Sequence, residues 1–238
     1  MALKKKVLED LQAFLPKKAL LVDEEVSNRK AGGLHTEEAI QAEIIVRPES
    51  TEEVSKILSV CNQAGQPVIV HGGLTGLVYG TRTSSDQLIL SLERMNAIEE
   101  IDPIGRTITC QSGVKLQSIQ EKAESENMIF PLDLGARGSC SIGGNISTNA
   151  GGNRVIRYGM TRESVLGLEA VTSDGTILSS MNRMIKNNAG YDLKQLFIGT
   201  EGTLGIVTRC VLRLREAPIS QNTALVGIED FSSIIRFL

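Results

Sequence analysis

The chain has 238 residues, of which 41% are hydrophobic, so it can bury the core of one large domain or two small ones. Its net charge of -3, with no basic run longer than Lys4-Lys5-Lys6, argues against a nucleic-acid-binding surface. No apolar run approaches the length of a bilayer span, and Glu9 and Asp10 interrupt the segment after the lysines, so we expect neither a transmembrane helix nor a signal peptide and place the protein in the cytoplasm.

The first half of the sequence predicts helices that alternate with short strands. Apolar residues at helical spacing predict a helix over 3–14, which Pro16 ends. A second helix follows a strand at 42–46; Ser50 or Thr51 caps it, and Gly65 ends it. Strands are then expected at 67–70 and 87–92, a hairpin at 98–101 and 107–111, a helix at 114–123 and an extended segment at 128–130.

The second half predicts mainly strands. They are expected at 164–172, 176–179, 206–214 and 224–228, with a helical turn at 193–197 and the start of a helix at 231–238. The last helix carries an apolar set with nothing downstream to cover it. Short strands mixed with helices indicate an α+β domain that contains two packed sheets.

Two glycine-rich stretches interrupt this pattern. His71-Gly72-Gly73-Leu74-Thr75-Gly76 directly follows a predicted strand, and six glycines fall between Gly135 and Gly152, interleaved with Ser, Thr and Asn. Glycine allows positive φ, and successive exposed N–H groups form concave anion sites. The sequence therefore predicts a backbone-lined cradle for a large phosphate-bearing molecule. The alternative is a floppy polar loop, which the recurring Ile142 and Ile146 argue against.

Histidine and cysteine usage predicts no metal site. No pair of the four cysteines has CxxC spacing, and the chain has only two histidines. Cys140 is the cysteine that lies in the cradle, where a packed side chain is favoured over a redox role. We assign no role to His35.

The usual nucleotide-binding fingerprints are missing, since neither GxGxxG nor GxxxxGK[ST] occurs. Four segments instead resemble the FAD-binding domain of the vanillyl-alcohol oxidase / p-cresol methylhydroxylase (PCMH) superfamily, namely 47–54, 72–76, 142–152 and 190–208. Within that superfamily they are most similar to the branch that contains the glycolate oxidase flavin subunit, D-lactate dehydrogenase and D-2-hydroxyglutarate dehydrogenase.

The resemblance implies a PCMH-type domain with two α/β subdomains. It divides the chain into an N-terminal helical segment (1–43), the FAD-binding domain (44–217) and the start of a connection to a cap domain (218–238). Because that cap domain is absent from the sequence, we expect a fragment, a truncated product or a subunit that another chain completes.

The resemblance also implies noncovalent FAD. Thr75 stands where some relatives attach the flavin through histidine, and His71 stands where relatives often carry arginine, so His71 is favoured as a strand-end residue near phosphate over a catalytic one. Glu201 either stabilises the glycine-rich corner at 199–205 or is a plain charge at the end of a helix. The candidate cofactor-binding residues are His71, Gly72, Gly73, Leu74, Thr75, Gly76, Pro131, Asp133, Cys140, Ser141, Gly143, Gly144, Asn145, Thr148, Asn149, Gly151, Gly152, Tyr158, Glu201, Gly202, Gly205 and Ile206.

The function implied is that of a flavin-dependent oxidoreductase which oxidises a D-2-hydroxy acid to the 2-oxo acid by hydride transfer to flavin N5, with a separate electron acceptor. No catalytic base is assigned, because Tyr158, Tyr191 and Lys186 are each better explained as structural. The alternative is a noncatalytic flavin-binding unit that needs a cap domain in trans. A third interpretation keeps the fold and changes the chemistry to enolpyruvyl-UDP-sugar reduction or alkyl-glycerone-phosphate synthesis.

Overall fold

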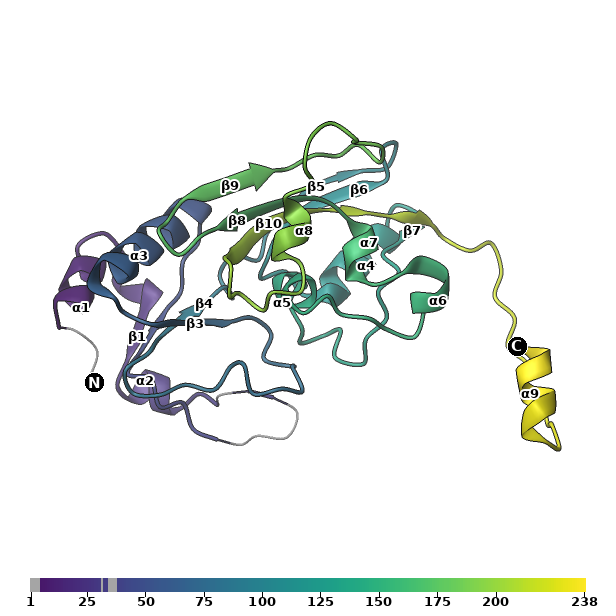
Figure 1. Cartoon of the computed structure of the whole chain (residues 1–238), viewed down its shortest axis with the longest axis horizontal. Helices are drawn as coiled ribbons and strands as arrows, with labels where there is room; N and C mark the ends of the chain where they lie inside the picture. Colours follow the sequence, from purple (N-terminus) through teal and green to yellow (C-terminus); the bar gives the residue numbers. More distant parts are fainter. Residues whose placement is uncertain (1–4, 31, 34–37) are drawn as a thin grey trace.

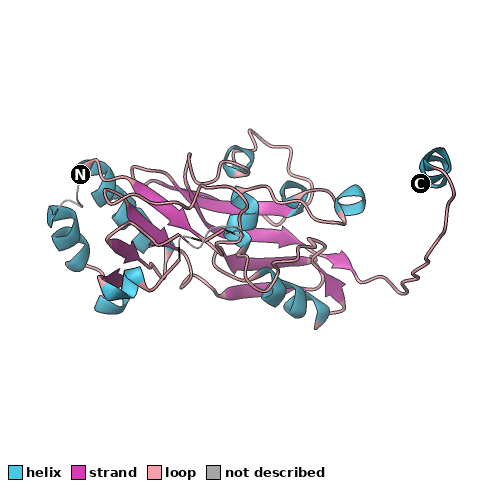
Figure 2. Ribbon diagram, turned by 90° about the horizontal axis from the view of Figure 1, so that it is seen from below, coloured by secondary structure: helices cyan, strands magenta, loops and turns pink. Residues whose placement is uncertain are grey.

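Two β-sheets and the helices between them form the body of the protein. The computed structural model describes residues 5–30, 32–33 and 38–238. Figure 2 shows an elongated body in which most strands run along the long direction. The last residues leave this body as an extended segment that ends in helix α9 (Phe231–Phe237), well away from both sheets (Figure 1).

The first sheet is built from the N-terminal part of the chain, in the strand order β1-β2-β4-β3. β1 is antiparallel to β2, and the other pairs are parallel. Side chains alternate along a strand, so Leu88 and Leu90 enter the core on one face while Ile89 enters the core on the other. The strands are β1 (Leu20–Val22), β2 (Ile44–Val46), β3 (Val68–His71) and β4 (Leu88–Ser91).

Helix α3 (Thr51–Ala64) covers one face of this sheet together with α1 (Lys5–Gln12). The side chain of Ser50 accepts a hydrogen bond from the Glu53 amide, and Gly65 ends the helix at φ 60°, which confirms both predicted ends. The same apolar cluster includes Val171 and Ile206 from the second sheet. Helix α3 is thus the joint between the two sheets.

The second sheet is antiparallel and has the order β5-β6-β10-β8-β9. The predicted hairpin supplies β5 and β6, and the predicted pair of strands with a turn at 173–175 supplies β8 and β9. The long β10 lies at the centre between β6 and β8. The strands are β5 (Ile98–Asp102), β6 (Thr107–Gln111), β8 (Val165–Val171), β9 (Ile177–Ser180) and β10 (Ile206–Arg213).

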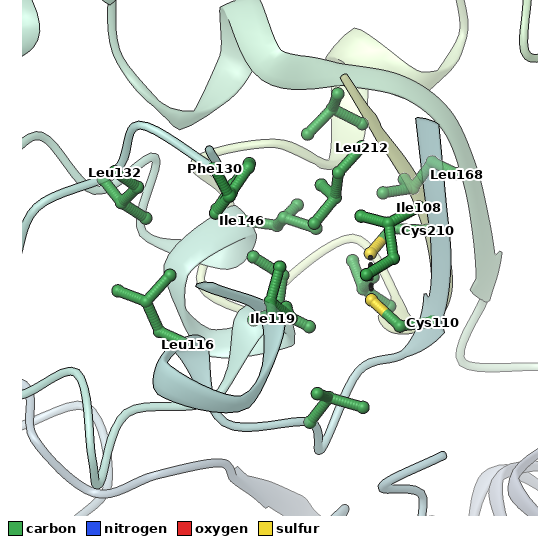
Figure 3. Close-up of a cluster of buried hydrophobic side chains, with 14 of the residues drawn as sticks. Ile108, Cys110, Leu116, Ile119, Phe130, Leu132, Ile146, Leu168, Cys210 and Leu212 are labelled. Carbon is green, nitrogen blue, oxygen red and sulfur yellow. Dashed lines mark hydrogen bonds between the residues drawn. The ribbon is translucent and has the colours of Figure 1, made fainter. Parts of the chain in front are cut away.

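One face of this sheet packs against α4 (Leu116–Glu124) and α5 (Ile142–Ser147). Figure 3 shows the resulting core, where Ile119 and Ile146 from the helices face Leu212 and the paired cysteines of β6 and β10. The Sγ atoms of Cys110 and Cys210 lie 3.6 Å apart, and both thiols are free. This core fixes α5, and with it the middle of the glycine-rich stretch.

Smaller elements complete the fold. β7 and β11 pair with each other, and the short helices α6, α7 and α8 follow the glycine-rich stretch. Near the N-terminus, a 3-10 turn precedes β1 and α2 packs on the second face of the first sheet. These elements are η1 (Lys17–Ala19), α2 (Glu24–Ser27), β7 (Met128–Ile129), α6 (Val155–Tyr158), α7 (Thr161–Ser164), α8 (Lys194–Phe197) and β11 (Arg215–Glu216).

Two expectations from the sequence differ from the structure. The strand predicted at 224–228 is wrong, because this segment is extended without a partner strand and a ladder needs one. The strand at 67–70, which its apolar residues predict to be buried, exists as β3 but is only half-buried, since it forms an edge of its sheet. The stretch from 133 to 159 contains α5 and α6, as expected from the argument against a floppy polar loop. His35 lies outside the described residues.

Candidate functional site

The turn after β3 presents a row of unpaired amides. β3 is parallel to β4, and its last residue, His71, accepts a hydrogen bond from the Leu92 amide at 3.1 Å. The N–H groups of the next five residues, Gly72 to Gly76, donate to no acceptor among the described residues. Backbone amides this close to a sheet edge normally have partners. Their arrangement suits an anionic ligand held by main-chain donors.

The two glycine-rich stretches meet at this turn. A Cβ atom added to Gly72 would lie 2.7 Å from Ser141 Oγ, and one added to Gly73 would lie 2.6 Å from the Cα atom of Cys140. Both approaches are closer than real Cβ contacts. Glycine is required at both positions because the turn packs directly against residues 139–141. The structure therefore brings together the two stretches that the sequence predicted to form one cradle.

The cradle glycines divide into packed and open positions. Gly143 is packed, since its amide donates to the Ser112 carbonyl at 2.7 Å and an added Cβ would lie 2.6 Å from Ser112 Cβ. Gly152 is packed against the Asp133 backbone, and Gly151 against Met160 Sδ. Gly76 is open, because an added Cβ meets no heavy atom within 4 Å. Gly144 is open except toward the Ser141 hydroxyl, whose Oγ would lie 3.2 Å from an added Cβ and would have to shift slightly.

One polar group in the cradle has no partner. The Oδ1 atom of Asn145 is buried and accepts no hydrogen bond in the described structure. Such a group costs free energy unless a ligand or water satisfies it. Three residues further along, the exposed Thr148 hydroxyl donates to the Gly144 carbonyl at 2.9 Å. The residues present thus fit a cofactor that offers hydrogen-bond donors along α5.

A second glycine-rich corner, at residues 199–205, is hydrogen-bonded to α5. The amides of Gly199 and Glu201 donate to the carbonyls of Ile146 and Ser147 at 3.1 and 2.9 Å. Glu201 has φ 53°, a strained value for a residue with a side chain, and Gly202 has φ 83°. The Glu201 side chain is exposed, so the residue shapes the corner through its backbone.

Beyond this corner lies a cleft of about 430 Å³. Gly202, Gly205 and Ile206 line one side, and Leu58 and Val70 lie among the apolar residues of the other walls. Gly205 itself is packed, because an added Cβ would lie 2.8 Å from both Phe197 Cε1 and the Val171 carbonyl oxygen. An apolar cleft bounded by main-chain atoms is a suitable place for a flat heterocycle.

His71 and Cys140 are both held neutral. His71 is buried, its Nε2 atom lies 3.0 Å from the Thr81 carbonyl oxygen, and its pKa is lowered, chiefly by burial. Burial likewise raises the pKa of the Cys140 thiol. A neutral histidine tied to a carbonyl and an un-ionised thiol both favour packing roles over catalysis.

The remaining predicted cofactor-binding residues lie around the edge of the cradle or away from it. Asn149 has φ 47°, and its side-chain oxygen accepts from the Arg162 amide at 3.0 Å. The Asp133 carboxylate lies 3.7 Å from Arg154 Nε, and Pro131 is buried. Tyr158 is half-buried and lines a separate cavity with Arg157. The structure does not bring Tyr158 to the turn at 72–76.

Sequence reasoning missed two residues that support the site. Arg162 donates to the carbonyls of Gln195 and Ile198, at 3.1 and 2.7 Å, and so connects α7 to the second glycine corner. Ser112, which follows β6, carries the contact with Gly143, and its Oγ is buried without a partner. Neither residue belongs to a local pattern, because each acts on a segment tens of residues away.

The described ranges hold neither a metal cluster nor a membrane span. No group of three or more His, Cys, Asp or Glu side chains within them is placed to hold a metal ion. Likewise, none of the helices within them has both the length and the apolar character needed to cross a bilayer.

Comparisons with known proteins show the family to which this chain belongs. The profile of a family described as "FAD binding domain" matches residues 42–180, more than half of the chain. A Danio rerio protein named D-2-hydroxyglutarate dehydrogenase, mitochondrial, is 42% identical over 231 residues, which is 96% of this chain and 43% of that protein. A D-2-hydroxyglutarate dehydrogenase from Xanthomonas citri pv. viticola is 44% identical over 192 residues, or 81% and 41% of the two chains.

The similarity extends to solved structures. An alkyldihydroxyacetonephosphate synthase superposes with a TM-score of 0.80 at 22% identity, covering 92% of this chain and 42% of that one. At this identity the likeness shows the fold alone. The chain spans less than half the length of these relatives.

Proposed function

This chain belongs to the FAD binding domain family and its cofactor is FAD, and we propose that it is the cofactor-binding part of a flavoenzyme that oxidises a D-2-hydroxy acid. The expected PCMH-type fold is confirmed by the family match and the structural neighbours.

The observation that carries the proposal is the row of five free amides at 72–76. We place the FAD diphosphate there, because successive main-chain donors neutralise phosphate oxygens without a basic side chain. The open position of Gly76 leaves room for the diphosphate, while the packed Gly73 holds the turn against Cys140.

We place the two ends of FAD on either side of this turn. The adenine end lies in the cleft at Gly202, Gly205 and Ile206, where apolar walls and main-chain atoms suit a flat ring. The flavin end lies along α5, where Gly144 is open and the Oδ1 atom of Asn145 awaits a donor. Thr75 stands at the position where some relatives attach the flavin through a histidine, so we infer that FAD is held noncovalently.

In the proposed reaction, a D-2-hydroxy acid becomes the 2-oxo acid. When bound, FAD supplies the redox chemistry by accepting a hydride, while the protein positions it and the substrate. The described residues of this chain orient FAD and exclude water from α5. The curated relatives named D-2-hydroxyglutarate dehydrogenase favour a dicarboxylic hydroxy acid as the substrate and a separate electron acceptor.

A second candidate is a noncatalytic flavin-binding unit that another domain or subunit completes. The observation that favours it is the state of His71, which is buried and bonded to the Thr81 carbonyl and is therefore not available to a substrate as a base. Turnover of D-2-hydroxyglutarate with a dye acceptor by residues 1–238, loaded with FAD, rejects this candidate. Flavin binding without turnover favours it.

The proposed FAD site is tested by Gly144→Val. An added Cβ meets only Ser141 Oγ, at 3.2 Å, so a small shift of that hydroxyl accommodates it in the apo protein. The rest of the new side chain occupies the place of the ligand, so we expect the variant to fold and to lose flavin. Gly227→Val is the control for the substitution itself, because an added Cβ there meets no heavy atom within 4 Å and the residue lies in the C-terminal segment. Flavin absorbance after gel filtration is the measurement, and release of the flavin on denaturation tests the noncovalent link. Full flavin content in Gly144→Val contradicts this placement.

The compartment stays a prediction. The sequence favours the cytoplasm, whereas the Danio rerio relative is named a mitochondrial protein. Fractionation of the source cells, with the protein followed by antibody, decides between the two compartments.

A further inference from the structure

A second cavity, of about 360 Å³, lies at the opposite end of the larger sheet from α3. It is lined by residues from four separate places: Arg106 in the β5–β6 turn, Arg157 and Tyr158 of α6, Ile185, and the β10–β11 junction with Arg213 and Arg215. Leu214 is buried at that junction, where its amide donates to the Arg106 carbonyl at 2.7 Å. The hydrogen bond and the strand pairing hold these walls together.

The cavity carries a surplus of positive charge. Four arginines and one carboxylate line it, and that carboxylate, Glu216, pairs with Arg106 at 2.5 Å. Among the described residues, the other three guanidinium groups have no carboxylate or hydrogen-bond partner, although that of Arg157 lies 5.4 Å from the centre of the Tyr158 ring. Burial and the like charges of Arg215 and Arg106 lower the pKa of Arg213, so these cations repel one another.

Unpaired arginines are concentrated at this place. Most arginines of the described chain have a carboxylate partner, as Arg183 has Glu100 and Arg209 has Glu99, or donate a side-chain hydrogen bond. Those with neither are Arg137, Arg157, Arg213 and Arg215, and all of these except Arg137 line the cavity. The chain as a whole is acidic, at -3, so a general basic surface does not explain the cluster.

We propose that this cavity is a binding site for a small organic dianion, in which Arg157, Arg213 and Arg215 clamp two carboxylates or one phosphate. Guanidinium groups bind planar or tetrahedral oxyanions through paired N–H donors. Ile185, Leu214 and the Tyr158 ring supply apolar wall for the carbon part of the ligand. A volume of this size accepts a metabolite and is small for a peptide segment.

The site is distinct from the proposed FAD site. It shares no residue with the turn at 72–76, with α5 or with the cleft at Gly202, Gly205 and Ile206. Its occupation therefore does not depend on the proposed oxidation reaction. A negative result for dianion binding leaves the proposed flavin site untouched, and the reverse also holds.

The test is calorimetric titration of the FAD-loaded chain with glutarate, with inorganic phosphate and with the monoanion pentanoate. We expect glutarate or phosphate to bind at least about tenfold more tightly than pentanoate, because pentanoate offers only one singly charged group to the clamp. Binding of glutarate alone identifies a dicarboxylate site, and binding of phosphate alone identifies a phosphate-ester site. No saturable heat with either dianion up to about 10 mM overturns the proposal.

Arg213→Gln assigns the binding to this cavity. We expect it to weaken binding of the dianion about tenfold or more, whereas Arg137→Gln, which removes the same charge from an exposed unpaired arginine elsewhere, changes it less than about twofold. Equal losses in the two variants overturn the proposal, because they indicate a general charge effect. Thermal unfolding and flavin absorbance check each variant, and Arg157→Gln, on the exposed side of α6, replaces Arg213→Gln if the latter does not fold.

Discussion

The backbone of Gly73 lies directly against Cys140, so closely that a Cβ on Gly73 would be 2.6 Å from the Cα atom of Cys140. These residues are 67 positions apart, and the contact joins the turn after β3 to the start of α5. Both segments belong to the proposed FAD site. The site is therefore assembled by close packing of two backbones, and its glycines serve either that packing or the ligand.

The first prediction separates these two uses of glycine. Gly73→Ala forces the two backbones apart, so we expect a loss of about 1–3 kcal/mol in the free energy of unfolding together with loss of FAD. Gly76→Ala adds a methyl group in open space, so the apo protein keeps its stability within about 0.5 kcal/mol while FAD binding weakens. Urea unfolding of the apo forms and fluorescence titration with FAD measure the two quantities. Equal apo stability of the two variants contradicts the packing argument.

The second prediction concerns the buried carboxylate of Glu169 in β8. It accepts hydrogen bonds from the hydroxyls of Thr51 in α3 and Thr208 in β10, at 2.7 and 3.1 Å, and lies 3.4 Å from Arg209. We expect Glu169→Ala to lower the free energy of unfolding by about 3 kcal/mol, because the buried Thr51 hydroxyl loses its acceptor and the Thr208 hydroxyl and Arg209 each lose one of theirs.

Glu100→Ala is the control for this prediction. Glu100 forms an ion pair with Arg183 that is exposed to solvent and screened by it, so we expect its loss to change stability little. Chemical denaturation of the two variants gives the comparison. A loss as small in Glu169→Ala as in Glu100→Ala shows that Glu169 does not connect α3 to the larger sheet.

The third prediction is a dependence of stability on acid pH through Glu93. Burial of this carboxyl opposes ionisation, but hydrogen bonds from Arg29, at 2.7 and 3.0 Å, and from Arg47, at 3.1 Å, outweigh burial and hold its pKa below 4.5. The folded state thus binds the proton less readily than the unfolded state does. The stabilisation is complete above pH 4.5 and is lost as the pH falls through the lowered pKa.

Glu93→Gln removes this dependence. We expect the variant to be less stable than the parent at neutral pH, with the difference shrinking below about pH 4. Urea midpoints measured between neutral pH and about pH 3 test this, with Glu124→Gln on the exposed side of α4 as the control. A difference that stays constant with pH counts against the role of Glu93.

The fourth prediction concerns His71, whose pKa is lowered from 6.5, mainly by burial. The unfolded state takes up the proton more readily, so stability is highest above pH 6.5 and falls as the pH drops from there toward the lowered pKa. His71→Gln keeps a donor for the Thr81 carbonyl and removes the titrating group. We expect the slope of stability between about pH 7 and pH 5.5 to flatten in this variant, and an unchanged slope assigns the titration to another group.

Much of the fold could be predicted from short stretches of sequence, because helix caps and turns depend on residues that are close together in the chain. The Ser50 cap, the Gly65 stop and the hairpin around 102–105 depend on residues a few positions apart, and each is confirmed. The strand expected at 224–228 fails for the opposite reason. Its alternation of apolar residues is a local signal, but a strand exists only where another strand supplies hydrogen bonds.

The sequence by itself determined the order of helices and strands and the two glycine stretches that mark the cofactor cradle. Only the tertiary structure decided which glycines are packed, as Gly73 and Gly143 are, and which are open, as Gly76 and Gly144 are. It alone gathered Arg106, Arg157 and Arg213 around one cavity. The physical reason is that capping, turn formation and periodicity act over a few residues, whereas close approach and charge clustering depend on segments that only the folded core brings together.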